Sequence, residues 1–105
     1  MKMKEFVVIA MAMFSCNAMA EARKITIDNV TYGREGVNVI ELTDNVAKLC
    51  NDKKSCSFKV TLKTLNTADP APDVTKELTI TWSCGDEGMP VQTRNDYATV
   101  KLSCK

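Results

Sequence analysis

The four cysteines that follow residue 20 constrain the fold of this chain more than any other feature. Cys50 and Cys56 enclose a short basic segment, whereas Cys84 and Cys104 each end a run in which apolar and polar residues alternate. Alternation with a period of two is typical of a β-strand with one buried face, and a cysteine at the end of each run is well placed to bridge neighbouring strands. The pattern predicts a small β domain stapled by disulfides rather than a cytosolic enzyme.

Four cysteines allow three pairings, and their spacing favours Cys50–Cys56 together with Cys84–Cys104. The alternative is a zinc site. It fits poorly because five residues separate Cys50 from Cys56 and the chain contains no histidine. We therefore expect neither a metal nor a cofactor.

The first twenty residues have the pattern of an export signal. Two lysines precede an uncharged apolar stretch from Phe6 to Phe14, and Ala18-Met19-Ala20 fits the small-x-small cleavage rule. The apolar stretch is too short to span a bilayer. A lipid anchor on Cys16 is the alternative, although the bulky residues before that cysteine disfavour it. We expect a secreted or periplasmic protein whose mature chain is a single domain, residues 21–105.

The charge balance and the missing motifs exclude several classes of function. Removing Lys2, Lys4 and Glu5 from the 14 basic and 13 acidic residues leaves 12 of each, so a basic face for nucleic acid is not expected. A second apolar segment that could hold the mature chain in a membrane is also lacking. Without histidine, a G-x-S-x-G motif or a phosphate-binding glycine loop, the chain offers little for catalysis. These features indicate a binding protein, not an enzyme.

The residue pattern predicts a mostly β fold: a small antiparallel β-sandwich with one short α-helix. The helix is expected to begin with Thr43 or Asp44 as its cap and to end near Asn51. Tyr32-Gly33-Arg34 is expected to turn out of the first strand. Strands are expected over residues 25–31, 37–42, 58–63, 76–84 and 97–104, with a loop at 66–73 and a turn at 85–90. The strand that ends at Cys84 should lie beside the C-terminal strand, with these residues facing the core: Leu78, Ile80, Trp82, Val100 and Leu102.

Three segments resemble the galactose/rhamnose-binding lectin domain of sea-urchin egg lectin and latrophilins. Residues 25–34 are similar to the family's Ile-x-Ile-x-x-Ala-x-Tyr-Gly-Arg, and residues 46–56 to its helix ending in Cys-Asn-x-x-x-x-Cys. Residues 69–84 are similar to its Asp-Pro-Cys-Pro-Gly-Thr-x-Lys-Tyr-Leu-x-Val-x-Tyr-x-Cys. The order and the internal spacing of the motifs agree over residues 25–84.

The chain also departs from the family pattern. Ala71 replaces a motif cysteine, and Asp73-Val74 replaces the family's Gly-Thr. The family begins with a strand of the form Cys-Glu-Gly-x-x-Leu-x-Leu-x-Cys, which is absent before Ile25 but is similar to residues 96–104. We infer a circular permutation that moves the first strand to the C-terminus. The alternative is an ordinary added hairpin, because any amphipathic strand alternates in this way.

The resemblance implies a metal-independent lectin that binds a glycan or monosaccharide in a shallow pocket. It implies that Lys76 donates hydrogen bonds to the sugar, that Asp69 and Asp96 accept them, and that Tyr32 flanks the ring. Each residue also has a structural interpretation: Lys76 as a solvated charge at a strand entry, Asp69 and Asp96 as turn residues, and Tyr32 as core packing. In the absence of a ligand, an exposed Lys76 should contribute little to folding.

A second hypothesis keeps the fold and replaces the sugar with a protein partner. The protein would then be a secreted or periplasmic protein-binding module, such as a hydrolase inhibitor or an adhesin subunit. Asp73-Val74 in place of the family's Gly-Thr supports this alternative, because fold alone does not assign function.

Overall fold

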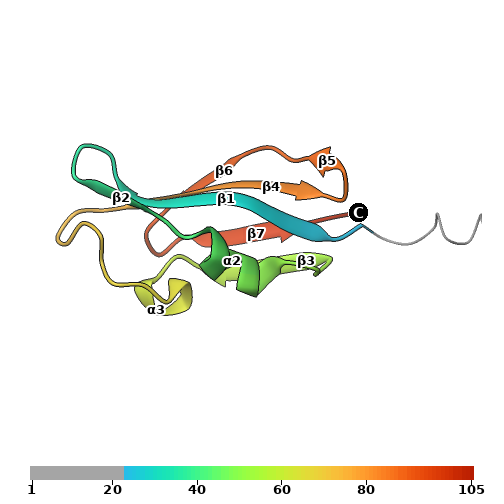
Figure 1. Ribbon diagram of the computed structural model, residues 1–105. Coiled ribbons are helices and arrows are strands. Elements are labelled where there is room, and N and C mark those ends of the chain that lie inside the picture. The colour runs from blue at the N-terminus through green and yellow to red at the C-terminus, as the bar shows by residue number, and fades with distance from the viewer. Residues whose placement is uncertain (1–22) are drawn as a thin grey trace, which may run out of the picture.

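The computed structural model describes residues 23–105, and the expected export signal lies outside the described residues. The strands and helices follow one another along the chain as shown in Figure 1. Their bounds are β1 (Ile25–Arg34), β2 (Asn38–Glu41), α2 (Thr43–Cys50), β3 (Ser55–Lys59), α3 (Leu62–Leu65), β4 (Glu77–Cys84), β5 (Glu87–Gly88), β6 (Gln92–Asn95) and β7 (Thr99–Ser103).

Two antiparallel sheets form the body of the protein, which confirms the predicted mostly β class. In the larger sheet β1 lies between β2 and β4, and the other edge of β4 pairs with β5 and then with β6. The smaller sheet consists of β3 and β7. Figure 1 shows it on one side of the larger sheet, with α2 next to β3. No helix in residues 23–105 is long and apolar enough to cross a membrane.

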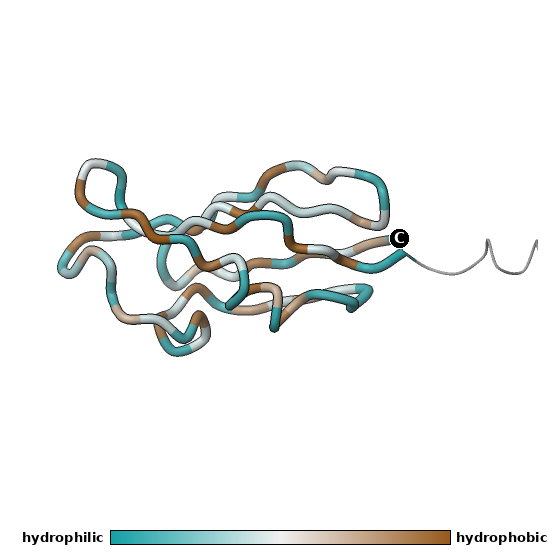
Figure 2. Tube along the Cα trace, viewed as in Figure 1, coloured by the Kyte–Doolittle hydropathy of each residue, from teal (hydrophilic) through white to brown (hydrophobic). Residues whose placement is uncertain are grey.

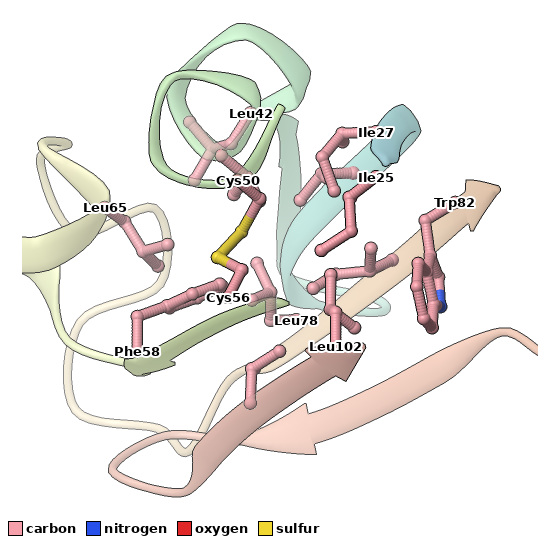
Figure 3. Packing of buried hydrophobic residues seen from close by; sticks show 14 of the residues in the cluster. Ile25, Ile27, Leu42, Cys50, Cys56, Phe58, Leu65, Leu78, Trp82 and Leu102 are labelled. Carbon is pink, nitrogen blue, oxygen red and sulfur yellow. A yellow bond between two sulfur atoms is a disulfide. The ribbon is translucent and has the colours of Figure 1, made fainter. Parts of the chain in front are cut away.

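The core lies between the two sheets and is supplied by alternate residues of each strand. Figure 2 shows hydrophobic and hydrophilic segments alternating along the strands, and Figure 3 shows the resulting cluster. The five residues predicted to face the core are all buried, namely Leu78, Ile80, Trp82, Val100 and Leu102. Each large aliphatic or aromatic side chain removed from water in this way contributes roughly 1.5–3 kcal/mol before conformational entropy is subtracted.

The pairing of the C-terminal strand differs from the prediction. β7 pairs with β3 in the smaller sheet, so it faces β4 across the core instead of lying beside it in one sheet. The edge of β4 is occupied by β5 and β6. The strand β6 was not expected, because Gln92–Asn95 contains no apolar alternation and forms only by pairing with β4.

The strand β1 contains a register shift and continues further along the chain than expected. In a regular strand Ile27 and Val30 would face opposite sides, because side chains alternate. A register shift between Ile27 and Asn29 places both of them on the core side. The strand then continues through the Tyr-Gly-Arg segment, which was wrongly predicted to be a turn, because β2 pairs with it. Gly33 is required at this pairing, since a Cβ atom there would lie 2.1 Å from the backbone oxygen of Asn38.

Two predictions about the helices also need correction. The N-cap of α2 is Leu42, and the hydroxyl of Thr43 instead accepts a hydrogen bond from the backbone N–H of Val30 at 3.0 Å. Leu62 lies in the single-turn helix α3 rather than in the preceding strand. The Thr61 side chain caps α3 by accepting from the backbone N–H of Thr64.

Both predicted disulfides are present in the fold. Cys50–Cys56 joins the end of α2 to β3, and Cys84–Cys104 joins the end of β4 to the residue that follows β7. The second bridge therefore ties the larger sheet to the smaller one, and it closes the longer of the two loops, for which the entropic stabilisation is larger.

Candidate functional site

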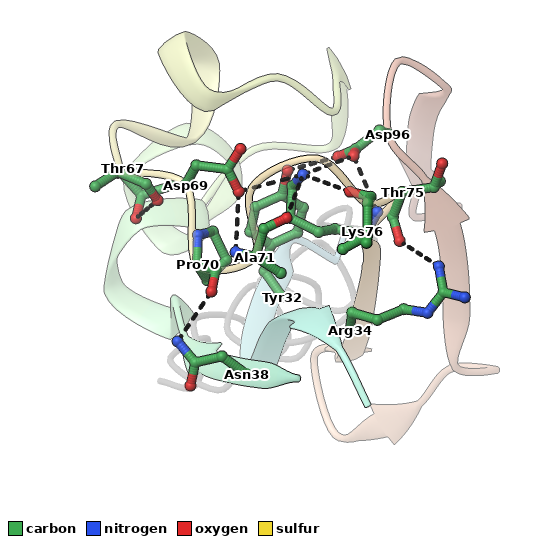
Figure 4. A network of polar contacts seen from close by, with 12 residues as sticks. Tyr32, Arg34, Asn38, Thr67, Asp69, Pro70, Ala71, Thr75, Lys76 and Asp96 are labelled. Atoms are coloured by element: carbon green, nitrogen blue, oxygen red, sulfur yellow. Dashed lines mark hydrogen bonds and ion pairs between the residues drawn. The ribbon is translucent and has the colours of Figure 1, made fainter. Parts of the chain in front are cut away.

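The four residues singled out from the sequence come together in one polar cluster. Tyr32 comes from β1, Asp69 from the loop between α3 and β4, Lys76 from the residue before β4, and Asp96 from the residue after β6. Figure 4 shows their polar atoms directed toward one another. Because the residues are separated by up to 64 positions in the chain, only the tertiary fold can assemble them.

Lys76 is at the centre of this cluster and is buried, with 6% of the residue exposed. Its ammonium nitrogen lies 2.9 Å from the backbone oxygen of Val74 and 3.4 Å from that of Ala71. It also lies 3.2 Å from Asp69 Oδ1 and 3.2 Å from Asp96 Oδ2. The expectation of a solvated lysine at the strand entry was therefore wrong, because the loop folds over the side chain and supplies it with acceptors.

Asp96 links Lys76 to the buried Tyr32 through hydrogen bonds. Its Oδ2 atom accepts from the backbone N–H of Lys76 at 2.9 Å, and its Oδ1 atom accepts from the Tyr32 hydroxyl at 2.5 Å. Burial raises the pKa of this carboxyl group, but the hydrogen bonds from Tyr32 and Lys76 and the charge of Lys76 outweigh burial and hold the pKa below its ordinary value of 3.8. Asp96 is consequently a carboxylate at neutral pH.

The same contacts keep Tyr32 and Lys76 protonated. Burial, followed by the hydrogen bond to Asp96 and the charge of that carboxylate, raises the pKa of Tyr32. Burial lowers the pKa of Lys76, but the hydrogen bonds to Asp96 and Asp69 more than compensate and raise the pKa overall. The ring of Tyr32 is itself buried, so only its hydroxyl end reaches the cluster.

The loop that carries Asp69 is held in place at several points. Asp69 Oδ1 accepts from the backbone N–H of Ala71 at 3.0 Å, as an Asx turn requires. Asn38 donates from its side chain to the oxygen of Pro70 at 3.1 Å. Further along the loop, the Arg34 guanidinium donates to the oxygen of Thr75 at 2.9 Å. The bonds from Asn38 and Arg34 attach the loop to the β1–β2 hairpin and hold the loop in place beside the cluster.

Two adjacent hollows open beside the cluster, with about 230 Å³ and about 630 Å³ of empty volume. Asp69, Lys76, Asp96 and Tyr97 line both hollows. Val60, Thr61, Leu62 and Tyr32 complete the smaller hollow, and Asp73, Val74 and Thr75 complete the larger one.

Tyr97 was missed by the sequence analysis. It was assigned to the start of the last strand, where a tyrosine is unremarkable. The available signal was its alignment with the glycine of the family's Cys-Glu-Gly motif, since a large aromatic residue at a glycine position of a turn is unusual.

The arrangement favours ligands that donate hydrogen bonds. The three N–H groups of the Lys76 ammonium already face four oxygen atoms within the protein. Both side-chain contacts of Asp69 use Oδ1, and Oδ2 makes none within residues 23–105 (Figure 4). The carboxylate of Asp69 can therefore accept hydrogen bonds from a bound molecule. Within the described part of the chain, no group of three or more His, Cys, Asp or Glu residues is arranged to hold a metal ion.

No protein-family model, curated protein or solved structure matches this chain.

Proposed function

We propose that this protein is a metal-independent carbohydrate-binding protein for terminal sugars of the galactose or rhamnose type, and that it acts after export as a secreted or periplasmic protein. The observation that carries the proposal is the convergence of Tyr32, Asp69, Lys76 and Asp96 beside an open hollow. These residues match the positions that the lectin resemblance assigns to sugar binding. Sugar sites of this kind need a few fixed polar groups within a shallow depression.

In this proposal the Asp69 carboxylate makes the direct contact and the Lys76 ammonium holds it in place. Asp69 Oδ2 accepts a hydrogen bond from a sugar hydroxyl, while Oδ1 remains bound to Lys76 and Ala71. Lys76 thus positions two carboxylates instead of acting as a free donor. Because these partners are in place before the ligand arrives, little side-chain entropy is lost on binding.

The charge of the cluster favours neutral sugars over acidic ones. One ammonium group, that of Lys76, faces the carboxylates of Asp69 and Asp96, and Asp73 adds a third carboxylate to the wall of the larger hollow. A uronic or sialic acid would bring a further negative charge close to these groups, which is unfavourable.

The positions of the first and last strands of the described residues support the proposed circular permutation. The backbone N–H of Ile25 donates to the oxygen of Lys53, and that of Cys104 donates to the oxygen of the next residue, Lys54. The start of β1 and the end of β7 are therefore neighbours, as Figure 1 also shows. A short connection could join them, and this is the geometry that a permutation requires.

The proposal is tested by a glycan array probed with residues 21–105, followed by titration calorimetry with the best ligand. We expect neutral glycans with terminal galactose or rhamnose to bind. Asp69→Asn should weaken binding about tenfold, because a hydrogen bond to a charged acceptor contributes roughly 1–1.5 kcal/mol more than one to a neutral acceptor. Asp86→Asn is the matched control. It makes the same chemical change in the exposed turn after β4 and should leave affinity unchanged.

Absence of binding across the neutral glycans would instead favour the protein-binding module. Two exposed valines support that alternative. Val37, just before the edge strand β2, is 61% exposed, and Val39, within that strand, is 49% exposed. Exposed apolar residues and unpaired backbone groups at a sheet edge suit a protein partner.

A further inference from the structure

Tyr97 is exposed to an unusual degree for a large side chain. Among residues 23–105 it has the highest exposed fraction of the large hydrophobic residues, 75%. It follows Asp96 directly and lines both hollows beside the polar cluster. A large aromatic surface therefore lies at the rim of the candidate sugar site.

The backbone that carries this ring is firmly held. The N–H of Tyr97 donates to the oxygen of Val60 at 2.8 Å, and the N–H of Val60 donates to the oxygen of Ala98 at 2.9 Å. On the other side, the Asp96 N–H donates to the oxygen of Lys76 at 3.0 Å. The ring is thus presented from a rigid turn, and a rigid aromatic residue offers contact area at a low entropic cost.

The conformation of Tyr97 is unfavourable for folding. Its φ angle is 70°, in the left-handed region that glycine and asparagine adopt most readily. A non-glycine residue there costs on the order of 1 kcal/mol or more. Neither burial nor a strand position compensates for this cost, so stability of the fold does not explain a tyrosine at this turn. Residues held in such conformations cluster at ligand sites.

We propose that the Tyr97 ring is the platform on which the apolar face of a bound pyranose stacks. This inference rests on the proposed carbohydrate-binding function and narrows the ligand class to pyranoses with an apolar face. Stacking requires a sugar face with an uninterrupted patch of C–H groups, as in galactose, where the axial 4-hydroxyl leaves the C3, C4 and C5 hydrogens on one side. The hydroxyl edge of the sugar is then directed toward Asp69. Tyr32 cannot serve as the platform because its ring is buried.

The test compares three variants by titration with the best-binding methyl glycoside. Tyr97→Gly removes the ring and relieves the backbone strain, so we expect affinity to fall about tenfold while the melting temperature stays constant or rises. Tyr97→Phe keeps the ring and should bind as the wild-type protein does. Asp52→Gly relieves the same kind of strain at the turn after α2, where φ is 67°, and should leave affinity unchanged.

The outcomes separate this inference from the function on which it depends. If the wild-type protein binds a glycan and Tyr97→Gly binds it within about twofold, the platform is wrong and the carbohydrate-binding function stands. If the wild-type protein binds no glycan, both fail. Tyr97→Asn provides a second ring-free variant that also tolerates the left-handed conformation. Equal affinity for this variant would overturn the platform in the same way.

Discussion

The replacement of Lys76 by methionine should strongly destabilise the protein. Methionine keeps the apolar stem and removes only the ammonium group, leaving Asp69 and Asp96 without their common cation. Removing one partner of a buried ion pair typically costs about 3–5 kcal/mol. Asp69 retains a 30% exposed side chain and can recover some hydration, so we place the loss at the lower end, about 3 kcal/mol.

The assay is thermal and urea unfolding of the disulfide-bonded protein. For a domain of this size about 3 kcal/mol corresponds to a fall in melting temperature on the order of 15 °C. Lys48→Ala, which removes an exposed lysine from α2, should change stability by less than about 0.5 kcal/mol. In the double variant Lys76→Met with Asp96→Asn, the loss should be smaller than the sum of the two single losses, because the unpaired charge is removed. A change below about 3 °C for Lys76→Met would refute the reasoning, since it would mean that the carboxylates do not depend on the ammonium group.

Three further predictions concern stability. Replacing Cys84 and Cys104 by serine should lower the free energy of unfolding by about 3 kcal/mol, and replacing Cys50 and Cys56 should lower it by about 2 kcal/mol, because the Cys84–Cys104 bridge closes the longer loop. Urea unfolding measures both losses, and the opposite ranking would contradict this explanation. The pKa of Asp96 is lowered in the fold, so the stability that it contributes is present above pH 3.8 and is lost as the pH falls through the folded-state value. Asp96→Asn should therefore reduce the pH dependence of unfolding below pH 4, and an unchanged acid limb would count against the cluster. Deletion of residues 96–105 removes β7 and the disulfide partner of Cys84, so circular dichroism should show an unfolded chain. A cooperative melt near that of the intact protein would show that β7 is not needed for folding.

Much of the fold could be predicted because the chain encodes it locally. Strict alternation marks β4 and β7, and the cysteine that ends each alternating run indicated which bridge connects them. The choice of partner strand could not be read in this way. An amphipathic strand presents the same pattern whether it extends the larger sheet or faces it across the core, as β7 does with β3.

The candidate site was only partly predictable. The resemblance identified the four residues that meet in the cluster, but it did not indicate that Lys76 is buried. Burial arises because the loop closes over the side chain and supplies the Val74 and Ala71 oxygens, which is a property of the tertiary structure. Tyr97 illustrates the reverse case: its exposure cannot be read from the sequence, and only its alignment with the glycine of the lectin motif indicates its left-handed φ angle.

The carbohydrate site is tested most directly by amide NMR of the mature protein titrated with methyl β-galactoside and methyl α-rhamnoside at millimolar concentration. We expect saturable shift changes in the Asp69–Lys76 loop and in the Asp96–Ala98 turn, with the amides of the far turn at Asp86 unchanged. Changes that centre on other parts of the surface, or none with either sugar, would contradict the assignment of this site.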